Sequence, residues 1–180
     1  ENEAIARTAA PGSLAIVKYL EQNEWGMLGF MTAAADLDNC HERLNELGVQ
    51  TPPPWGMSRT RPDGRELAWK MLLPGGGSWR KAWPTVIDWA TADHERIHWD
   101  GLGEHPNGAR ALPYIRIGAS DSKQSLAIME QAFGLQAEPV RAMDDLDAHG
   151  VRFWLDTGSV DIVVANAGGN SPLDHIIETQ

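Results

Sequence analysis

Apolar and polar residues follow the same order twice along the chain, in two copies about 85 residues apart. In each copy, a short apolar segment precedes a stretch in which apolar residues have helical spacing, and three strand-like segments follow. Trp69 follows Asp36 at the same distance along the sequence as Trp154 follows Asp121. This internal repeat predicts two strand–helix–strand–strand–strand units, and therefore an α+β fold.

The first copy begins with a predicted strand at 27–32. A helix capped by Asp36 or Asp38 follows and ends at Gly48, where glycine tolerates the left-handed conformation of a helix end. Its apolar stripe consists of Leu37, Cys40, Leu44 and Leu47. The remaining predicted strands are 58–61, 66–72 and 84–90, the first two joined by a turn at Pro62-Asp63-Gly64.

The second copy repeats this order. A strand at 112–118 precedes a helix whose apolar face is formed by Leu126, Met129 and Phe133. Three strands follow at 138–143, 151–157 and 160–166, with turns predicted at His149-Gly150 and Gly158-Ser159. Outside both copies, Leu14, Val17 and Leu20 predict a further helix that starts near Ser13.

These patterns divide the chain into five segments. They are an N-terminal helical segment at 1–25, a first unit at 26–91, a crossover at 92–110, a second unit at 111–167 and a C-terminal tail at 168–180.

The charge of the chain restricts its partners. The net charge is −10, from 25 acidic and 15 basic residues, and this charge repels nucleic acid and anionic membrane surfaces. No apolar run approaches the roughly 20 residues that a transmembrane helix needs. Cys40 is the only cysteine, so an internal disulfide is excluded and a reducing, cytoplasmic compartment is expected. Nucleic acid and membranes are therefore discounted as partners, and a homodimer is left open.

Tandem βαβββ units with Asp-Leu-Asp at 36–38 resemble the vicinal oxygen chelate superfamily of glyoxalase, bleomycin-resistance and extradiol dioxygenase proteins. The runs SRTRPDGRELAWKMLLP (58–74), WPTVIDW (83–89) and HPNGARAL (105–112) are similar to the glyoxalase-like domain family of bacterial proteins. This resemblance covers about residues 26–165. It implies a cupped mixed sheet with the helices outside, a ligand cup between the units, and a further unit that precedes residue 1.

The resemblance also implies where metal ligands would lie. Superfamily members place them on the first and last strands of each unit, which correspond here to Gly29 and Tyr114 and to Asp88 and Asp161. Glycine has no side chain, and tyrosinate ligation is uncommon. Two carboxylates without an imidazole make a weak site for a transition metal. A divalent metal is therefore disfavoured, and the cofactor is unknown.

Strand alternation predicts which side chains line the cup. The cup face would hold Met27, Met31, Asp88, Leu112, Tyr114, Arg116 and Asp161, with two tryptophans near its walls. Arg59 is added because a guanidinium recognises carboxylates and phosphates. The predicted substrate-binding residues are Asp88, Tyr114, Arg116, Asp161, Trp69, Trp154 and Arg59. They suit a small organic molecule that is anionic or aromatic. In the alternative interpretation, Arg116 pairs with Asp88 or Asp161 and the face is only a polar core.

Three functions remain open, and the catalytic residues are unknown. The first is a glyoxalase-like enzyme, such as a lyase, an isomerase or a relative of the dioxygenases. The second is a non-catalytic protein that sequesters an aromatic ligand or drug. The third and most distant is a zinc-dependent hydrolase, because His94-Glu95-Arg96-Ile97-His98 matches the H-E-x-x-H zinc motif. The motif has little apolar surface around it, and Arg96 places a charge at an inner position.

Overall fold

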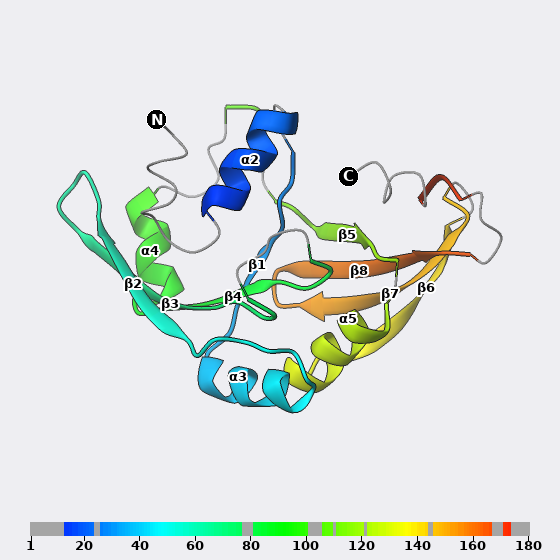
Figure 1. Ribbon diagram of the computed structural model, residues 1–180. Helices are drawn as coiled ribbons and strands as arrows, with labels where there is room; N and C mark the ends of the chain where they lie inside the picture. The colour runs from blue at the N-terminus through cyan, green and yellow to red at the C-terminus, as the bar shows by residue number, and fades with distance from the viewer. Residues whose placement is uncertain are drawn as a thin grey trace. The chain divides into compact units, whose positions relative to one another are not determined.

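The chain is described here from a computed structural model, which divides it into two compact units, Glu1–Asp93 and His94–Gln180 (Figure 1). The structure describes residues 13–23, 26–76, 81–100, 106–109, 111–120, 122–143, 146–166 and 171–173. The first twelve residues, Asp121 and most of the predicted tail at 168–180 lie outside these ranges.

The first unit contains a four-stranded mixed sheet. Its elements are α2 (Ser13–Asn23), β1 (Met31–Ala33), α3 (Leu37–Glu46), β2 (Trp55–Thr60), β3 (Glu66–Leu72) and β4 (Thr85–Trp89). The strand order is β1-β4-β3-β2, with β1 parallel to β4 and the other pairs antiparallel. The helix predicted near Ser13 is confirmed as α2.

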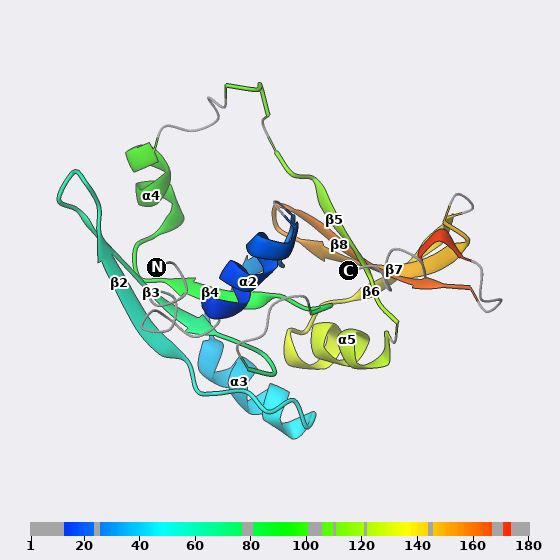
Figure 2. The same cartoon turned by 45° about the horizontal axis from the view of Figure 1, so that its top comes forward.

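Helix α3 shows how the sequence directs the local structure. The Asp36 carboxylate accepts a hydrogen bond from the Asn39 backbone N–H at 3.0 Å, so Asp36 is the N-cap. Leu37 and Leu44 are buried, and the helix packs against β3 and β4 of its own unit (Figures 1 and 2). Gly48 ends the helix with φ +75°, the left-handed conformation that the sequence predicts there.

The first strand is shorter than predicted. The sequence placed it at 27–32, but β1 spans only Met31–Ala33, where it pairs with Thr85–Ile87 of β4. Met27 is 71% exposed and precedes the strand, as does Gly29. A strand extends only as far as its partner offers backbone hydrogen-bonding groups. The pairing with β4 begins at Thr85, the first residue of that strand, so residues before Met31 have no strand partner there.

The second unit repeats the arrangement. Its elements are α4 (Asp93–Asp100), which spans the boundary between the units, β5 (Tyr114–Gly118), α5 (Lys123–Ala127), the π-helix η1 (Ile128–Ala132), β6 (Ala137–Met143), β7 (Ala148–Leu155) and β8 (Gly158–Ala165). The strand order is β5-β8-β7-β6, with β5 parallel to β8. The predicted α+β fold of tandem βαβββ units is therefore confirmed.

Both predicted turns of the second unit were misplaced. His149 and Gly150 lie inside β7, and the chain turns instead at Leu146-Asp147, where Asp147 has φ +43°. Gly158 and Ser159 lie inside β8, because Leu155 pairs with Gly158 around a two-residue turn at Asp156-Thr157. The turn position sets which residues of β7 and β8 face each other.

The helix of the second unit also departs from the predicted α-helical face. After α5, the backbone widens into the π-helix η1, in which the Phe133 N–H bonds to the Ile128 carbonyl. Met129 is buried as expected, whereas Leu126 and Phe133 are only half-buried. The residues that enter the core are Ser125, Ile128, Met129 and Ala132.

None of the helices in the described part of the chain has the length and apolar character that crossing a bilayer requires.

Candidate functional site

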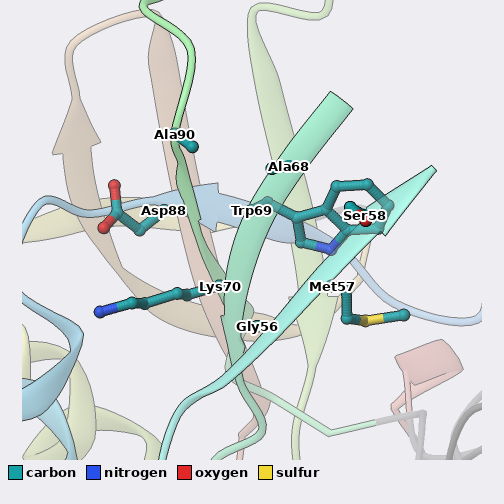
Figure 3. A pocket seen from close by; sticks show the side chains of 8 residues that line it. All are labelled: Gly56, Met57, Ser58, Ala68, Trp69, Lys70, Asp88 and Ala90. Carbon is teal, nitrogen blue, oxygen red and sulfur yellow. The ribbon is translucent and has the colours of Figure 1, made fainter. Parts of the chain in front are cut away.

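The first unit has an open pocket of about 440 Å³ on its sheet (Figure 3). It is lined by Gly56, Met57, Ser58, Ala68, Trp69, Lys70, Asp88 and Ala90. Glycine, serine and alanine are small, so they leave space above the sheet, and Lys70 and Asp88 supply opposite charges. A volume of this size suits a small organic molecule.

Asp88 and Lys70 face each other across β4 and β3. Figure 3 shows both side chains pointing to one side of these strands, while Trp69 and Met57 point to the other. Asp88 is half-buried and Lys70 is exposed. Within the residues that the structure describes, neither side chain has a hydrogen bond or ion pair, so both charges remain available to a ligand.

Trp69 forms part of an aromatic pair. Its ring centroid lies 5.5 Å from that of Trp89, at an interplanar angle of 51°. Tilted pairs of this kind are typical of packed aromatic residues. Trp69 therefore contributes to packing as well as to the pocket lining.

In the second unit, charged residues of alternating sign form one row across all four strands. Arg116 of β5 pairs with Asp161 of β8, Asp161 pairs with Arg152 of β7, and Arg152 pairs with Glu138 of β6. Directly paired residues project from the same face of a sheet. We call these four residues, Arg116, Asp161, Arg152 and Glu138, the charged row.

Asp161 is the buried centre of the charged row, with none of its side chain exposed. Arg152 donates from Nε to Oδ1 at 2.7 Å and from Nη2 to Oδ2 at 2.8 Å, which is a bidentate pair. This hydrogen bonding to Asp161 raises the pKa of Arg152 above its ordinary value. The Nη2 of Arg116 lies 3.7 Å from Oδ2, and 37% of its side chain is exposed.

Two exposed aromatic residues lie beside the charged row. Tyr114 is 50% exposed and Trp154 is 53% exposed, and both pair with Ser159 of β8. The Arg116 guanidinium lies 5.6 Å from the Tyr114 ring centre, and the Arg152 guanidinium lies 5.3 Å from the Trp154 ring centre. The Trp154 Nε1–H donates to Glu138 at 2.8 Å, so Glu138 fixes the indole. This face therefore carries two guanidinium groups, each beside an exposed aromatic ring.

Four of the seven predicted binding residues therefore lie together in the second unit: Tyr114, Arg116, Asp161 and Trp154. Of the two partners that the alternative interpretation gave Arg116, the structure shows a contact with Asp161, at 3.7 Å, and ligand binding by Arg116 stays a prediction. Asp88 and Trp69 line the pocket of the first unit. Arg59 lies on β2, is exposed and is absent from the pocket lining.

The equal spacing of the two tryptophans does not reflect equivalent positions. In both units, a cation on the penultimate strand faces an aspartate on the last strand, as Lys70 with Asp88 and Arg152 with Asp161. Relative to these cations, Trp69 comes one residue before Lys70 and Trp154 comes two residues after Arg152. Successive residues of a strand point to opposite faces, so the two indoles have different relations to the charges.

Sequence reasoning missed Arg152, Glu138 and Lys70. A turn assigned to Asp156-Thr157 would have placed Arg152 opposite Asp161, because the register of a hairpin follows from its turn. The glycine in Gly158-Ser159 instead favoured a turn two residues further on.

The metal site implied by the family resemblance does not fit this chain. Gly29 lies before β1 and offers no side chain, and both Asp161 oxygens accept hydrogen bonds from Arg152. Among the described residues, no group of three histidine, cysteine, aspartate or glutamate side chains could hold a metal ion. The structure places two guanidinium groups beside Asp161, and their charge repels a metal cation there.

The possible zinc motif forms a helix, but its key side chains face solvent. His94, Glu95 and His98 of α4 are all exposed. A catalytic zinc site needs three protein ligands in a shielded cavity, so the exposure of these side chains disfavours a hydrolase here. Cys40 is half-buried in α3, and its burial is the main reason why the pKa of its thiol is raised, which makes a thiolate nucleophile unfavourable.

The first of three solved structures compared with this chain has the same type of fold. A hypothetical protein from Staphylococcus aureus aligns with a TM-score of 0.57 and 15% identity over 89% of this chain, which spans only 60% of that protein. A glyoxylase/bleomycin resistance protein/dioxygenase domain from Frankia gives a TM-score of 0.43 at 14% identity, covering 80% of this chain and 94% of that one. FosX, a fosfomycin resistance protein from Listeria monocytogenes in complex with Mn(II) and sulfate, gives a TM-score of 0.34 at 13% identity. That alignment covers 79% of this chain and 93% of FosX.

No curated protein matches the chain. The model of the glyoxalase-like domain family matches residues 2–133, which is most of the sequence. This match includes the first unit, α4, β5 and the helical segment of the second unit. The chain therefore belongs to the glyoxalase-like domain family.

Proposed function

We propose that this protein binds a small organic molecule with an anionic group and an aromatic ring, and that Arg116, Tyr114 and Trp154 hold it. Membership of the glyoxalase-like domain family supports binding or conversion of a small molecule in general. The nature of the ligand is inferred from the second unit alone. The cup that the two units are expected to share stays a prediction from the family resemblance.

The observation that carries this proposal is the partly exposed guanidinium of Arg116 beside a carboxylate that already has a partner. Arg152 occupies both oxygens of Asp161, so Arg116 makes only a 3.7 Å contact with them. A guanidinium has five N–H donors, and an incoming carboxylate or phosphate can accept two of them side by side. Arg116 can therefore bind an anion while Asp161 remains neutralised.

The aromatic part of the proposal comes from Tyr114 and Trp154. Two large aromatic side chains, each with half of its surface exposed, lie on one sheet face, and clustered exposed apolar groups are typical of binding sites. A flat ligand ring can stack on such a surface, with the arginine contributing a cation–π contact. Conversion of a small molecule, rather than binding alone, is a second candidate function, and it concerns the pocket of the first unit, where the half-buried Asp88 carboxylate has no side-chain partner in the part of the chain that the structure describes.

Calorimetric titration tests the proposal, with 2-naphthoate as the first probe of a panel of aryl carboxylates and aryl phosphates. We expect the Arg116→Ala variant to bind about tenfold more weakly or worse, since a charge-assisted hydrogen bond is lost. Arg43→Ala is the matched control, because Arg43 is an exposed arginine on α3. Equal affinities of both variants would remove Arg116 from the site. Product analysis after incubation with Asp88→Asn and wild-type protein separates conversion from binding.

A further inference from the structure

The charged row contains two arginines around a single buried aspartate. Asp161 has no exposed surface, whereas the side chains of Arg152 and Arg116 are 30% and 37% exposed. A buried carboxylate is very unfavourable without a cation that hydrogen-bonds to it. One of the two arginines must therefore neutralise Asp161, and the geometry shows which one does so.

Arg152 makes both short contacts with the carboxylate, and Arg116 makes only the long one. Arg152 is also held from its other side, since it pairs across the strands with Glu138 and its guanidinium covers the Trp154 ring. The planar fork of a guanidinium matches the two carboxylate oxygens, which a lysine cannot do. Arg152 is therefore fixed in the sheet, while the exposed N–H groups of Arg116 remain available to a ligand.

We infer that Arg152 is the built-in cation of the second unit, which neutralises Asp161, releases Arg116 for an oxyanion and takes the place of a metal ion. This inference rests on the proposed function and adds the class of group that is recognised. The ligand carries a carboxylate, phosphate or sulfate, and its binding needs no divalent metal. Arg152 is a positioning residue, because it acts through Asp161 and Arg116.

The chemistry of the donor set supports this assignment. A divalent cation at Asp161 would have to displace two charge-assisted hydrogen bonds and would then lie close to two guanidinium groups. An oxyanion next to Arg116 meets the opposite situation, because the three members of the charged row nearest to it carry one excess positive charge, and Glu138, which balances the row, lies on the opposite edge strand β6. Loss of Arg152 would reverse this balance, since Arg116 would then be drawn to the unpaired carboxylate and away from the ligand.

The test compares 2-naphthoate with its neutral analogue 2-naphthamide, each titrated calorimetrically in EDTA and again in excess Mn(II). We expect wild-type protein to prefer 2-naphthoate by about tenfold under both conditions. In Arg152→Ala, the ratio of the two affinities should fall to near one. The affinity for 2-naphthamide, which depends on the aromatic residues, should stay unchanged. In the double variant Arg152→Gln with Asp161→Asn, no buried charge attracts Arg116, so the preference should return.

This return is the result that a purely structural role of Arg152 does not predict. An unchanged preference in Arg152→Ala, or none in a folded double variant, would overturn the inference. If Arg152→Ala does not fold, the uncharged double variant and Arg152→Lys, which keeps the charge but not the fork, take its place. Circular dichroism establishes that each variant is folded.

Electron paramagnetic resonance of Mn(II) tests the inference without any organic ligand. Uptake of Mn(II) by wild-type protein that is lost in Asp161→Asn would overturn it, and the absence of such uptake supports it. If wild-type protein binds neither naphthalene compound nor any other member of the panel, the proposed function fails, and the Mn(II) experiment still decides the role of Arg152.

Discussion

Arg152 and Asp161 face each other across β7 and β8, and two hydrogen bonds of 2.7 and 2.8 Å join them. Removal of the arginine leaves a carboxylate inside the unit without its main partner, which is more damaging than removal of a surface ion pair. We expect Arg152→Ala to lower the melting temperature by about 5 °C or more. Arg116→Ala, whose contact is longer and partly exposed, should lower it less. Equal melting temperatures of these variants would contradict the assigned pairing.

The core of the first unit depends on Leu44, which has no exposed surface and lies on the inner face of α3. Leu44→Ala removes buried methyl groups and leaves a cavity, so the free energy of unfolding should fall by about 2–5 kcal/mol. Leu20→Ala on α2 is the control, because Leu20 is 44% exposed, and a change within about 0.5 kcal/mol is expected there. Urea denaturation measures both variants, and similar losses would show that the burial of the two leucines does not differ.

The N-terminus of α3 is stabilised by the Asp36 carboxylate, which accepts the Asn39 N–H. Asp36→Ala should lower the free energy of unfolding by about 1 kcal/mol, since one backbone donor loses its partner. Asp38 lies in the first turn, where a carboxylate is stabilised by the helix dipole, so Asp38→Ala should lower the free energy of unfolding by about 0.3 kcal/mol. A larger loss for Asp38 would mean that the cap had been assigned to the wrong aspartate.

The turn between β2 and β3 provides a pH-dependent contribution to stability. The Arg65 N–H, which donates to Asp63 at 3.1 Å, lowers the pKa of Asp63 below its ordinary 3.8, and the nearby arginines add to this effect. Because the folded pKa is the lower one, the contribution is complete above pH 3.8 and is lost as the pH falls through the folded value. Asp63→Asn removes this charge.

Wild-type protein should therefore melt slightly above Asp63→Asn at neutral pH, and the difference should vanish in strong acid. Asp63 is exposed, so added salt should also reduce the difference. Calorimetric melting over an acid pH series checks both effects. A difference that persists unchanged in strong acid would mean that the Asp63 charge is not its source.

Short-range patterns allowed the fold class and most elements to be predicted. The stripe of α3, the turn at Pro62-Asp63-Gly64 and the strand Glu66–Leu72 depend on neighbours in sequence, and each was found close to its predicted place. The extent of β1 depends on its pairing with β4, far away along the chain, and was predicted too long. No local pattern in the sequence reveals how much of a strand will find a partner.

The same limit applies to the candidate site. Arg116 and Asp161 were predicted from alternation within single strands, which needs no knowledge of neighbouring strands. Arg152 can be identified only from the register of β7 and β8. The predicted turn lay two residues too far along the chain, so it gave the wrong register. The π-helix after α5 limited the prediction in the same way. Its wider turn moves Phe133 away from the apolar face that a regular α-helix would give it.

The position of Trp154 gives the second unit its own spectroscopic reporter. The indole is half exposed, covered on one face by the Arg152 guanidinium and tethered through Nε1 to Glu138. A molecule that settles against this ring or displaces either neighbour must change the polarity around the indole, and therefore its emission. The difference between the fluorescence spectra of wild-type protein and Trp154→Phe isolates this one chromophore from the seven other tryptophans, so that occupancy can be followed in solution without any label.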